Sequence, residues 1–142
     1  MRLIVVGTGG MAKNHVEHFA RIPGVEIVGA VDTDATRLTA FCDTFDIKKR
    51  FSSLDEALAW GEFDSVTNVT PDKAHNPTTL PLLAAGKHVL CEKPLAENYD
   101  KALEMTEAAE RAGVVNMVNL TYRNVAQLQK AREMVISGEI GT

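Results

Sequence analysis

The sequence lacks any apolar run close to the roughly 20 residues that cross a bilayer. Its first residues, Met1-Arg2 before four apolar residues, do not resemble a signal peptide. Only two cysteines occur, Cys42 and Cys91, which lie 49 positions apart without a CxxC pattern. Cys91 has no evident basic partner, so we expect a core residue rather than a nucleophile. These absences argue against membrane-spanning and disulfide-stapled proteins, and we expect a cytoplasmic protein with reduced thiols.

Positive charge is also scarce, because 15 Lys and Arg residues stand against 19 Asp and Glu residues, a net charge of −4. Nucleic-acid binding needs a clustered basic surface. The longest basic run, Lys48-Lys49-Arg50, fits a solvated strand edge instead. We therefore expect no nucleic-acid partner and no membrane contact. The 142 residues, 45% of them hydrophobic, suffice for one domain with its own core.

Apolar runs typical of strands alternate with amphipathic helical stretches along the chain. Strands are expected at 2–6, 25–32, 49–51, 64–70, 87–92 and 114–120. Helices are expected at 10–22, 34–45, 53–60, from about Asn76 to 85, at 98–112 and, within the stretch 125–141, up to Gly138. This alternation predicts an α/β fold: a doubly wound parallel sheet (Rossmann) in the strand order 3-2-1-4-5-6, inside three αβα layers.

A glycine-rich turn, Gly7-Thr8-Gly9-Gly10-Met11-Ala12, joins the first strand to the first helix and fits the pattern G-x-G-x-x-A. Gly7 would permit the tight turn, and Gly9 would let a pyrophosphate approach the backbone. Ala12 would keep the helix close to the strand, and the helix N-terminus would attract phosphate. The alternative is a glycine-rich turn without a ligand.

An acidic residue, Asp32, ends the second strand 20 positions after Ala12. A carboxylate there can accept hydrogen bonds from the adenosine ribose and would repel a 2′-phosphate, which favours NAD over NADP. Thr33 and Arg37 leave NADP as an alternative cofactor, because an arginine one helical turn further on could reach that phosphate. The strand, turn, helix and acid together predict a dinucleotide-binding site.

Two further segments, TPDKAH (70–75) and CEKPLAEN (91–98), follow the fourth and fifth strands at the same edge of the sheet. With the glycine turn and Asp32, they make the chain resemble the glucose–fructose oxidoreductase/inositol dehydrogenase (Gfo/Idh/MocA) family of oxidoreductases. The resemblance covers essentially the whole chain. It rests on Thr70-Pro71 followed by His75, on AGKHVLCEKPLA (85–96), and on Tyr122-Arg123.

The resemblance implies roles for the Glu92-Lys93-Pro94 segment. Lys93 would be the catalytic residue, lying beside the nicotinamide and the substrate carbon and assisting proton transfer at the reacting hydroxyl. An ammonium in a partly dry cleft can stabilise a developing alkoxide. Glu92 would pair with Lys93 or orient the cofactor end of the site. The resemblance also implies a cis bond between Lys93 and Pro94.

Other expected site residues leave alternatives open. Thr70 and Pro71 resemble the nicotinamide-side loop, although Asp72 stands where the family often has asparagine. His75 would either cap the next helix or line the cleft. Tyr122 and Arg123 would face the substrate, with a surface ion pair as the alternative for Arg123. The remaining candidates, His15 and His18, lie three positions apart without a third ligand, so we expect packing and surface roles and no metal site.

Members of the resembled family are usually more than twice as long and carry a second α/β domain that closes the substrate pocket. We therefore expect an NAD(P)-binding domain at 1–120 and, at 121–142, a linker helix leading to an absent domain. The parent protein would be a homo-oligomeric NAD-dependent dehydrogenase acting on a small-molecule hydroxyl compound such as a sugar or cyclitol, and the 142-residue chain alone would be inactive. The alternative is a non-catalytic dinucleotide-binding module.

Overall fold

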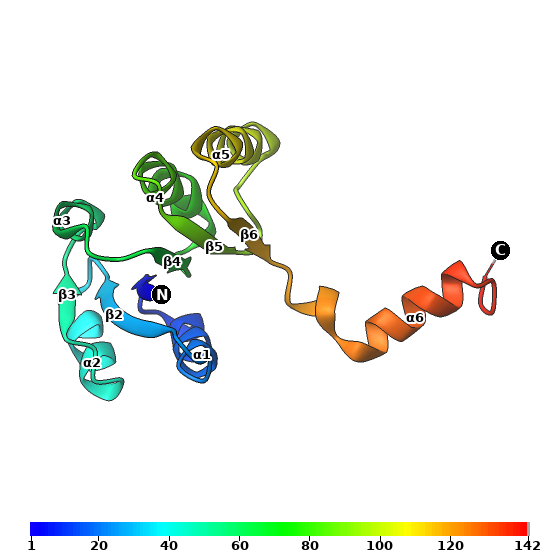
Figure 1. The fold of residues 1–142 in the computed structure, drawn as a ribbon, viewed down its shortest axis with the longest axis horizontal. Helices are drawn as coiled ribbons and strands as arrows, with labels where there is room; N and C mark the ends of the chain where they lie inside the picture. Colours follow the sequence, from blue (N-terminus) through cyan, green and yellow to red (C-terminus); the bar gives the residue numbers. More distant parts are fainter. Residues whose placement is uncertain (142) are drawn as a thin grey trace.

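The structure is a computed structural model that describes residues 1–141, and it is built around one six-stranded parallel sheet (Figure 1). The strands follow the spatial order β3-β2-β1-β4-β5-β6, which confirms the order expected from the sequence. Their bounds are β1 (Arg2–Val6), β2 (Glu26–Val31), β3 (Lys49–Phe51), β4 (Ser65–Asn68), β5 (His88–Glu92) and β6 (Asn116–Asn119).

Helices cover both faces of this sheet and make a three-layer αβα arrangement (Figure 1). The helices are α1 (Gly10–Phe19), α2 (Ala35–Thr44), α3 (Leu54–Trp60), α4 (Asp72–Ala84), α5 (Tyr99–Ala112) and α6 (Ala126–Ile136). Helices α1 and α2 pack on one face through a core that includes Val16 and Phe41. Helices α3, α4 and α5 pack on the other face, where Leu82 and Met105 are buried. Both faces of the sheet are therefore covered and packed against apolar side chains, as in other parallel sheets.

The chain changes direction between β1 and β4, the two strands at the middle of the sheet. The connection after β1 runs to α1 on one face, and the connection after β4 runs to α4 on the other. Two connections that leave in opposite directions open a crevice at the carboxyl ends of their strands, which is where ligands bind in such sheets.

The turn after β1 fits tightly against the chain that follows β4. Gly7 has a φ of +90°, and its N–H donates to the carbonyl of Val31 at 2.9 Å. A Cβ on Gly7 would lie 3.0 Å from the backbone atoms of Val69 and Thr70. Gly9, by contrast, precedes α1 with an ordinary φ of −74°, and a Cβ there would meet nothing within 4 Å. Gly7 is thus required by the fold, whereas Gly9 leaves an open surface.

Helix α4 starts earlier than the sequence suggested. It begins at Asp72, directly after Pro71, and not near Asn76. Pro77 and Pro81 consequently lie inside the helix, where each forfeits one backbone hydrogen bond. The expectation was wrong because the fixed φ of proline remains compatible with helical geometry even where its hydrogen bond is lost.

The last helix, α6, extends away from the sheet after a short 3₁₀ turn, η1 (Thr121–Asn124) (Figure 1). It ends at Ile136, close to the end expected at Gly138, and has no buried residue. Within residues 1–141, every helix is too short or too polar to span a membrane.

Substitution of Gly7 tests whether the turn is fixed by close packing. We expect Gly7→Ala to lower the free energy of unfolding by about 2–4 kcal/mol, because the new Cβ combines an unfavourable φ with a backbone clash. Gly9→Ala is the matched control and should cost less than about 1 kcal/mol. Urea denaturation of both variants measures this, and equal losses would contradict the packing described here.

Candidate functional site

A cleft of about 540 Å³ lies at the carboxyl ends of β1, β2 and β4. The structure brings together in this cleft most residues expected to bind the cofactor: Gly7, Gly9, Gly10, Met11, Asp32, Thr33, Arg37, Thr70 and Pro71. Two other residues of the glycine turn lie beneath it. Thr8 is buried against Asp32, and Ala12 is fully buried between α1 and the sheet.

The carboxylate of Asp32 is the most strongly hydrogen-bonded group in this cleft. Oδ2 accepts from the backbone N–H of Thr8 at 2.8 Å, from its hydroxyl at 2.7 Å and from Nε of Arg37 at 3.0 Å. Oδ1 accepts from the N–H of Asp34 at 2.9 Å and from Nη2 of Arg37 at 2.7 Å. These donors occupy roughly the four lone-pair positions that a carboxylate offers. A ribose hydroxyl can therefore reach Asp32 only by replacing one of them.

These donors also set the charge of Asp32. Burial alone would raise the pKa of this carboxyl, but the hydrogen bonds from Arg37, from Thr8 and from the Asp34 backbone outweigh burial. The pKa of Asp32 is consequently held well below its usual range. Asp32 is a fixed negative charge at neutral pH, and Arg37, whose side chain is 49% exposed, is the donor with the most freedom to leave.

A second loop, at Thr70 and Pro71, is held by Asn68 at the end of β4. Oδ1 of Asn68 accepts from the N–H of Thr70 at 3.2 Å and from its hydroxyl at 2.7 Å. Its Nδ2 donates to Thr78 and to Thr79 of α4 at 2.8 and 3.0 Å. Asn68 is fully buried, and its bonds fix the loop relative to α4.

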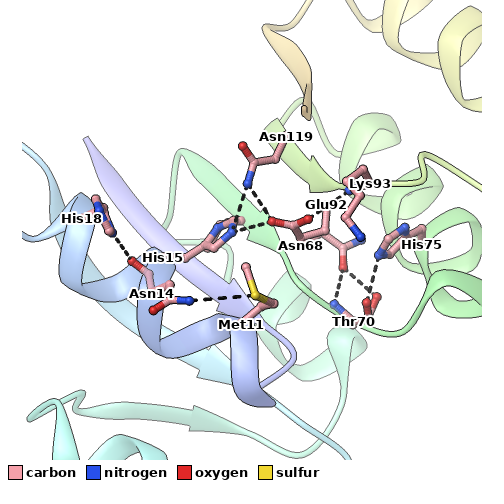
Figure 2. Close-up of polar contacts among 11 residues, drawn as sticks. Met11, Asn14, His15, His18, Asn68, Thr70, His75, Glu92, Lys93 and Asn119 are labelled. Carbon is pink, nitrogen blue, oxygen red and sulfur yellow. Dashed lines mark hydrogen bonds and ion pairs between the residues drawn. The ribbon is translucent and has the colours of Figure 1, made fainter. Parts of the chain in front are cut away.

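His75 joins this loop to the one that follows β5. Its Nε2 lies 2.9 Å from the carbonyl oxygen of Thr70, and its Nδ1 lies 2.8 Å from that of Pro94 (Figure 2 labels Thr70 and His75). The side chain is fully buried. His75 therefore neither caps a helix nor lines the cleft, the two roles expected for it, and instead bridges two loops of the site.

The loop after β5 presents Lys93 to solvent. Lys93 and Pro94 are exposed, and the peptide bond between them is cis, as expected. Lys93 therefore does not lie in a partly dry cleft within residues 1–141. Pro94 lines a shallow hollow with Pro71, so the loops after β4 and β5 adjoin each other.

Glu92, at the end of β5, pairs with residues other than the Lys93 side chain. Its Oε1 accepts from Nε2 of His15 at 2.8 Å and from Nδ2 of Asn119 at 2.6 Å (Figure 2). Among residues 1–141, its Oε2 accepts from the backbone N–H of Lys93 alone, at 3.1 Å. Burial would raise the pKa of Glu92, but the hydrogen bonds from Asn119, His15 and the Lys93 backbone outweigh burial and lower it.

The hydrogen bonds that join Glu92 to His15 and Asn119 were not predicted from the sequence. His15 was expected to have a packing or surface role, but it is buried and bonded to Thr67 and Glu92. The available signal was a polar residue inside or at the end of an apolar run, Thr67 in SVTNVT and Asn119 in NMVNL. His18 is exposed, as expected of a surface residue. Residues 1–141 contain no group of three or more His, Cys, Asp or Glu side chains placed to hold a metal ion.

Two expected substrate residues lie apart from the cleft. Tyr122 and Arg123 are exposed on η1 and line a hollow with Gln129 and Arg132 of α6.

Cys91 is buried on β5, as expected of a core residue, and burial raises the pKa of its thiol to about 11. That thiol is consequently a poor nucleophile at neutral pH.

Acid titration tests the charge of Asp32. Its pKa is lower in the folded than in the unfolded chain, so its stabilising effect is complete above about pH 5 and is lost as the pH falls below about 4. Asp32→Asn should lower the free energy of unfolding at pH 7 and flatten its decline between about pH 5 and pH 2. Denaturation at several pH values measures this, with the exposed Glu110→Gln as control; an unchanged slope in Asp32→Asn would contradict it.

The sequence and the structure of this chain are similar to those of known proteins. Residues 1–120 match the family model for Gfo/Idh/MocA, described as an oxidoreductase family with an NAD-binding Rossmann fold. The 1,5-anhydro-D-fructose reductase of Ensifer adhaerens is 36% identical over 137 residues, which cover 96% of this chain and 41% of that protein. The glucose-6-phosphate 3-dehydrogenase of Bacillus subtilis (strain 168) is 31% identical over 137 residues, covering 96% of this chain and 38% of that protein.

A solved structure is also similar to this chain in fold and sequence. The crystal structure of the WlbA dehydrogenase from Bordetella pertussis in complex with NADH and UDP-GlcNAcA matches with a TM-score of 0.92 and 32% identity, over 99% of this chain and 43% of that one. The chain thus spans about two fifths of the length of these proteins. Since the family model covers most of the sequence, the chain belongs to the Gfo/Idh/MocA family of oxidoreductases and forms its NAD-binding Rossmann domain.

Proposed function

We propose that the chain is the cofactor-binding half of an NAD-dependent dehydrogenase that transfers hydride between nicotinamide and a hydroxyl-bearing carbon of a sugar, cyclitol or related compound. The observation that carries this proposal is the adjacency of the glycine-turn cleft with its charged Asp32 to the loops that bear Thr70 and Lys93. The names of two relatives, a 1,5-anhydro-D-fructose reductase and a glucose-6-phosphate 3-dehydrogenase, support the substrate class.

The adenosine half of the cofactor would bind between the glycine turn and β2. The open backbone at Gly9 and Gly10, next to the N-terminus of α1, offers N–H groups and a positive dipole end to the pyrophosphate. Asp32 would accept the ribose hydroxyls after Arg37 moves aside. With its fixed negative charge, the same carboxylate disfavours a 2′-phosphate.

Lys93 would act at the reacting centre. When bound, NAD supplies the carbon that accepts or gives the hydride. In the direction of reduction, the Lys93 ammonium would hydrogen-bond the carbonyl oxygen and give it a proton as negative charge develops there; oxidation is the reverse. Glu92, through the Lys93 N–H, and His75, through the Pro94 carbonyl, hold the backbone on both sides of that lysine.

The remaining parts of the substrate site would come from η1 and from a further domain. The exposed Tyr122 and Arg123 would face the substrate once that domain covers the loop at Lys93. The chain's span of about two fifths of its relatives' length supports a larger enzyme, which we propose to be homo-oligomeric. The 142-residue chain alone would then bind cofactor without completing catalysis.

Cofactor selectivity tests the assignment of Asp32 and Arg37. We expect the chain to bind NADH more tightly than NADPH. Asp32→Ala should lower the affinity for NADH about tenfold, since it removes charge-assisted hydrogen bonds to the ribose. It should lower the affinity for NADPH less, because the repulsion between the carboxylate and the 2′-phosphate also disappears. Arg37→Ala should widen the preference for NADH, because a cation near the 2′-phosphate is lost. Calorimetric titration with both nucleotides measures all four effects.

The control for this experiment is Arg111→Ala, which removes a positive charge from the exposed surface of α5. It should leave the NADH to NADPH ratio unchanged. If the ratio of NADH to NADPH affinity changed in the same direction in Asp32→Ala and Arg37→Ala, the assignment would be contradicted. Wild-type protein that binds neither nucleotide would contradict the proposed function.

Turnover by the isolated chain tests its proposed status as half of an enzyme. We expect saturable NAD binding but no NADH formation with glucose, glucose 6-phosphate or myo-inositol, because the chain supplies Lys93 without a closed substrate pocket. Absorbance of NADH, followed on a preparation whose NAD binding has been measured, checks this. Turnover that disappears in Lys93→Ala would show that residues 1–142 are a complete catalyst.

A further inference from the structure

A polar cluster of four side chains, three buried and one half-buried, lies behind the exposed Lys93 loop, and of these four the proposed function uses only Glu92. His15 comes from α1, Thr67 from β4, Glu92 from β5 and Asn119 from β6 (Figure 2 labels three of them). His15, Thr67 and Glu92 are 7%, 0% and 6% exposed. His15 and Asn119 both bond the Glu92 carboxylate and Thr67 bonds His15, so the cluster joins four elements beside the proposed reacting centre.

The hydrogen bonds of this cluster have a fixed direction. A carboxylate can only accept, so Nε2 of His15 carries a proton and donates to Oε1 of Glu92 at 2.8 Å. In the neutral ring, Nδ1 then accepts from the hydroxyl of Thr67, 2.6 Å away. The imidazole is therefore held at both nitrogens, and it holds one oxygen of Glu92 in turn.

The other oxygen of Glu92 faces the Lys93 loop. Oε2 accepts from the backbone N–H of Lys93 at 3.1 Å, so any rotation of the carboxylate moves or breaks that bond. Without His15, Asn119 would be the one side chain within residues 1–141 still bonded to Oε1. The orientation of Glu92, and with it the backbone of Lys93, consequently depends on His15.

We propose that His15 is a positioning residue of the dehydrogenase: it orients Glu92 and thereby places Lys93 at the nicotinamide end of the cofactor site. This proposal rests on the proposed function. The same helix, α1, starts at the glycine turn that would receive the pyrophosphate. His15 therefore links the phosphate side of the cleft to the nicotinamide side within a single helix, and its removal should affect the nicotinamide end selectively.

The first test compares two nucleotides on the 142-residue chain. NADH carries the nicotinamide, whereas ADP-ribose has the same adenosine, pyrophosphate and second ribose without it. We expect His15→Ala to lower the affinity for NADH at least about fivefold and to change the affinity for ADP-ribose less than about twofold. The first figure is that expected for the loss of one hydrogen bond to a charged group. His18→Ala, on the exposed side of the same helix, should change neither.

The second test uses the geometry of the ring. In His15→Gln the amide nitrogen can take the place of Nε2 and still donate to Glu92, whereas in His15→Asn the shorter amide reaches only the position of Nδ1, near Thr67. We expect Gln to restore NADH affinity to within about twofold and Asn not to restore it. A merely space-filling or stabilising role would favour neither amide in this way.

A local readout accompanies both tests. Hydrogen exchange of the Lys93 amide, followed by NMR without nucleotide, should accelerate in His15→Ala and His15→Asn and return to the wild-type rate in His15→Gln. Equal loss of NADH and ADP-ribose affinity in His15→Ala, or unchanged binding of both, would overturn the positioning role and leave the proposed function intact. Failure of wild-type protein to bind either nucleotide would overturn both.

Discussion

The close approach of Gly7 to the backbone of Val69 and Thr70 decides where the other groups of the site can lie. The turn after β1 is tied by hydrogen bonds on both sides, since the Gly7 N–H donates to Val31 and the Val6 carbonyl accepts from Val69. With no Cβ between them, the ends of β1, β2 and β4 form one continuous edge. Asp32 and Thr70 face the same cleft because both follow directly from strands locked to that turn.

Much of this architecture could be predicted from the sequence because its signals are local. Strand and helix periodicity, with Gly7 and Asp32 each directly after a strand, suffices for the doubly wound order and for the position of the acid. The cis Lys93–Pro94 bond followed from resemblance rather than from any physical pattern. The family's second domain was likewise an inference from resemblance, and it remains a proposal.

The hydrogen-bond partners could not be predicted because they depend on which strands become neighbours. Glu92 and His15 are 77 positions apart, and nothing near either residue indicates that β5 lies opposite α1. Arg37 was considered as a partner for a 2′-phosphate, yet it lies against Asp32, because the two side chains meet where β2 passes into α2. Polar residues at strand ends were visible in the sequence, but their pairing was a property of the folded sheet.

The crowded surroundings of Asp32 have a consequence for the energetics of the cofactor in its proposed place. A ribose hydroxyl that reaches this carboxylate replaces a guanidinium instead of filling an empty position, so bonds are exchanged rather than added. The gain from the new contact is therefore partly offset by the loss of the Arg37 bonds, and the pyrophosphate and the apolar walls of the cleft must supply much of the affinity. Asp32 in this role works chiefly as a filter on the identity of the nucleotide.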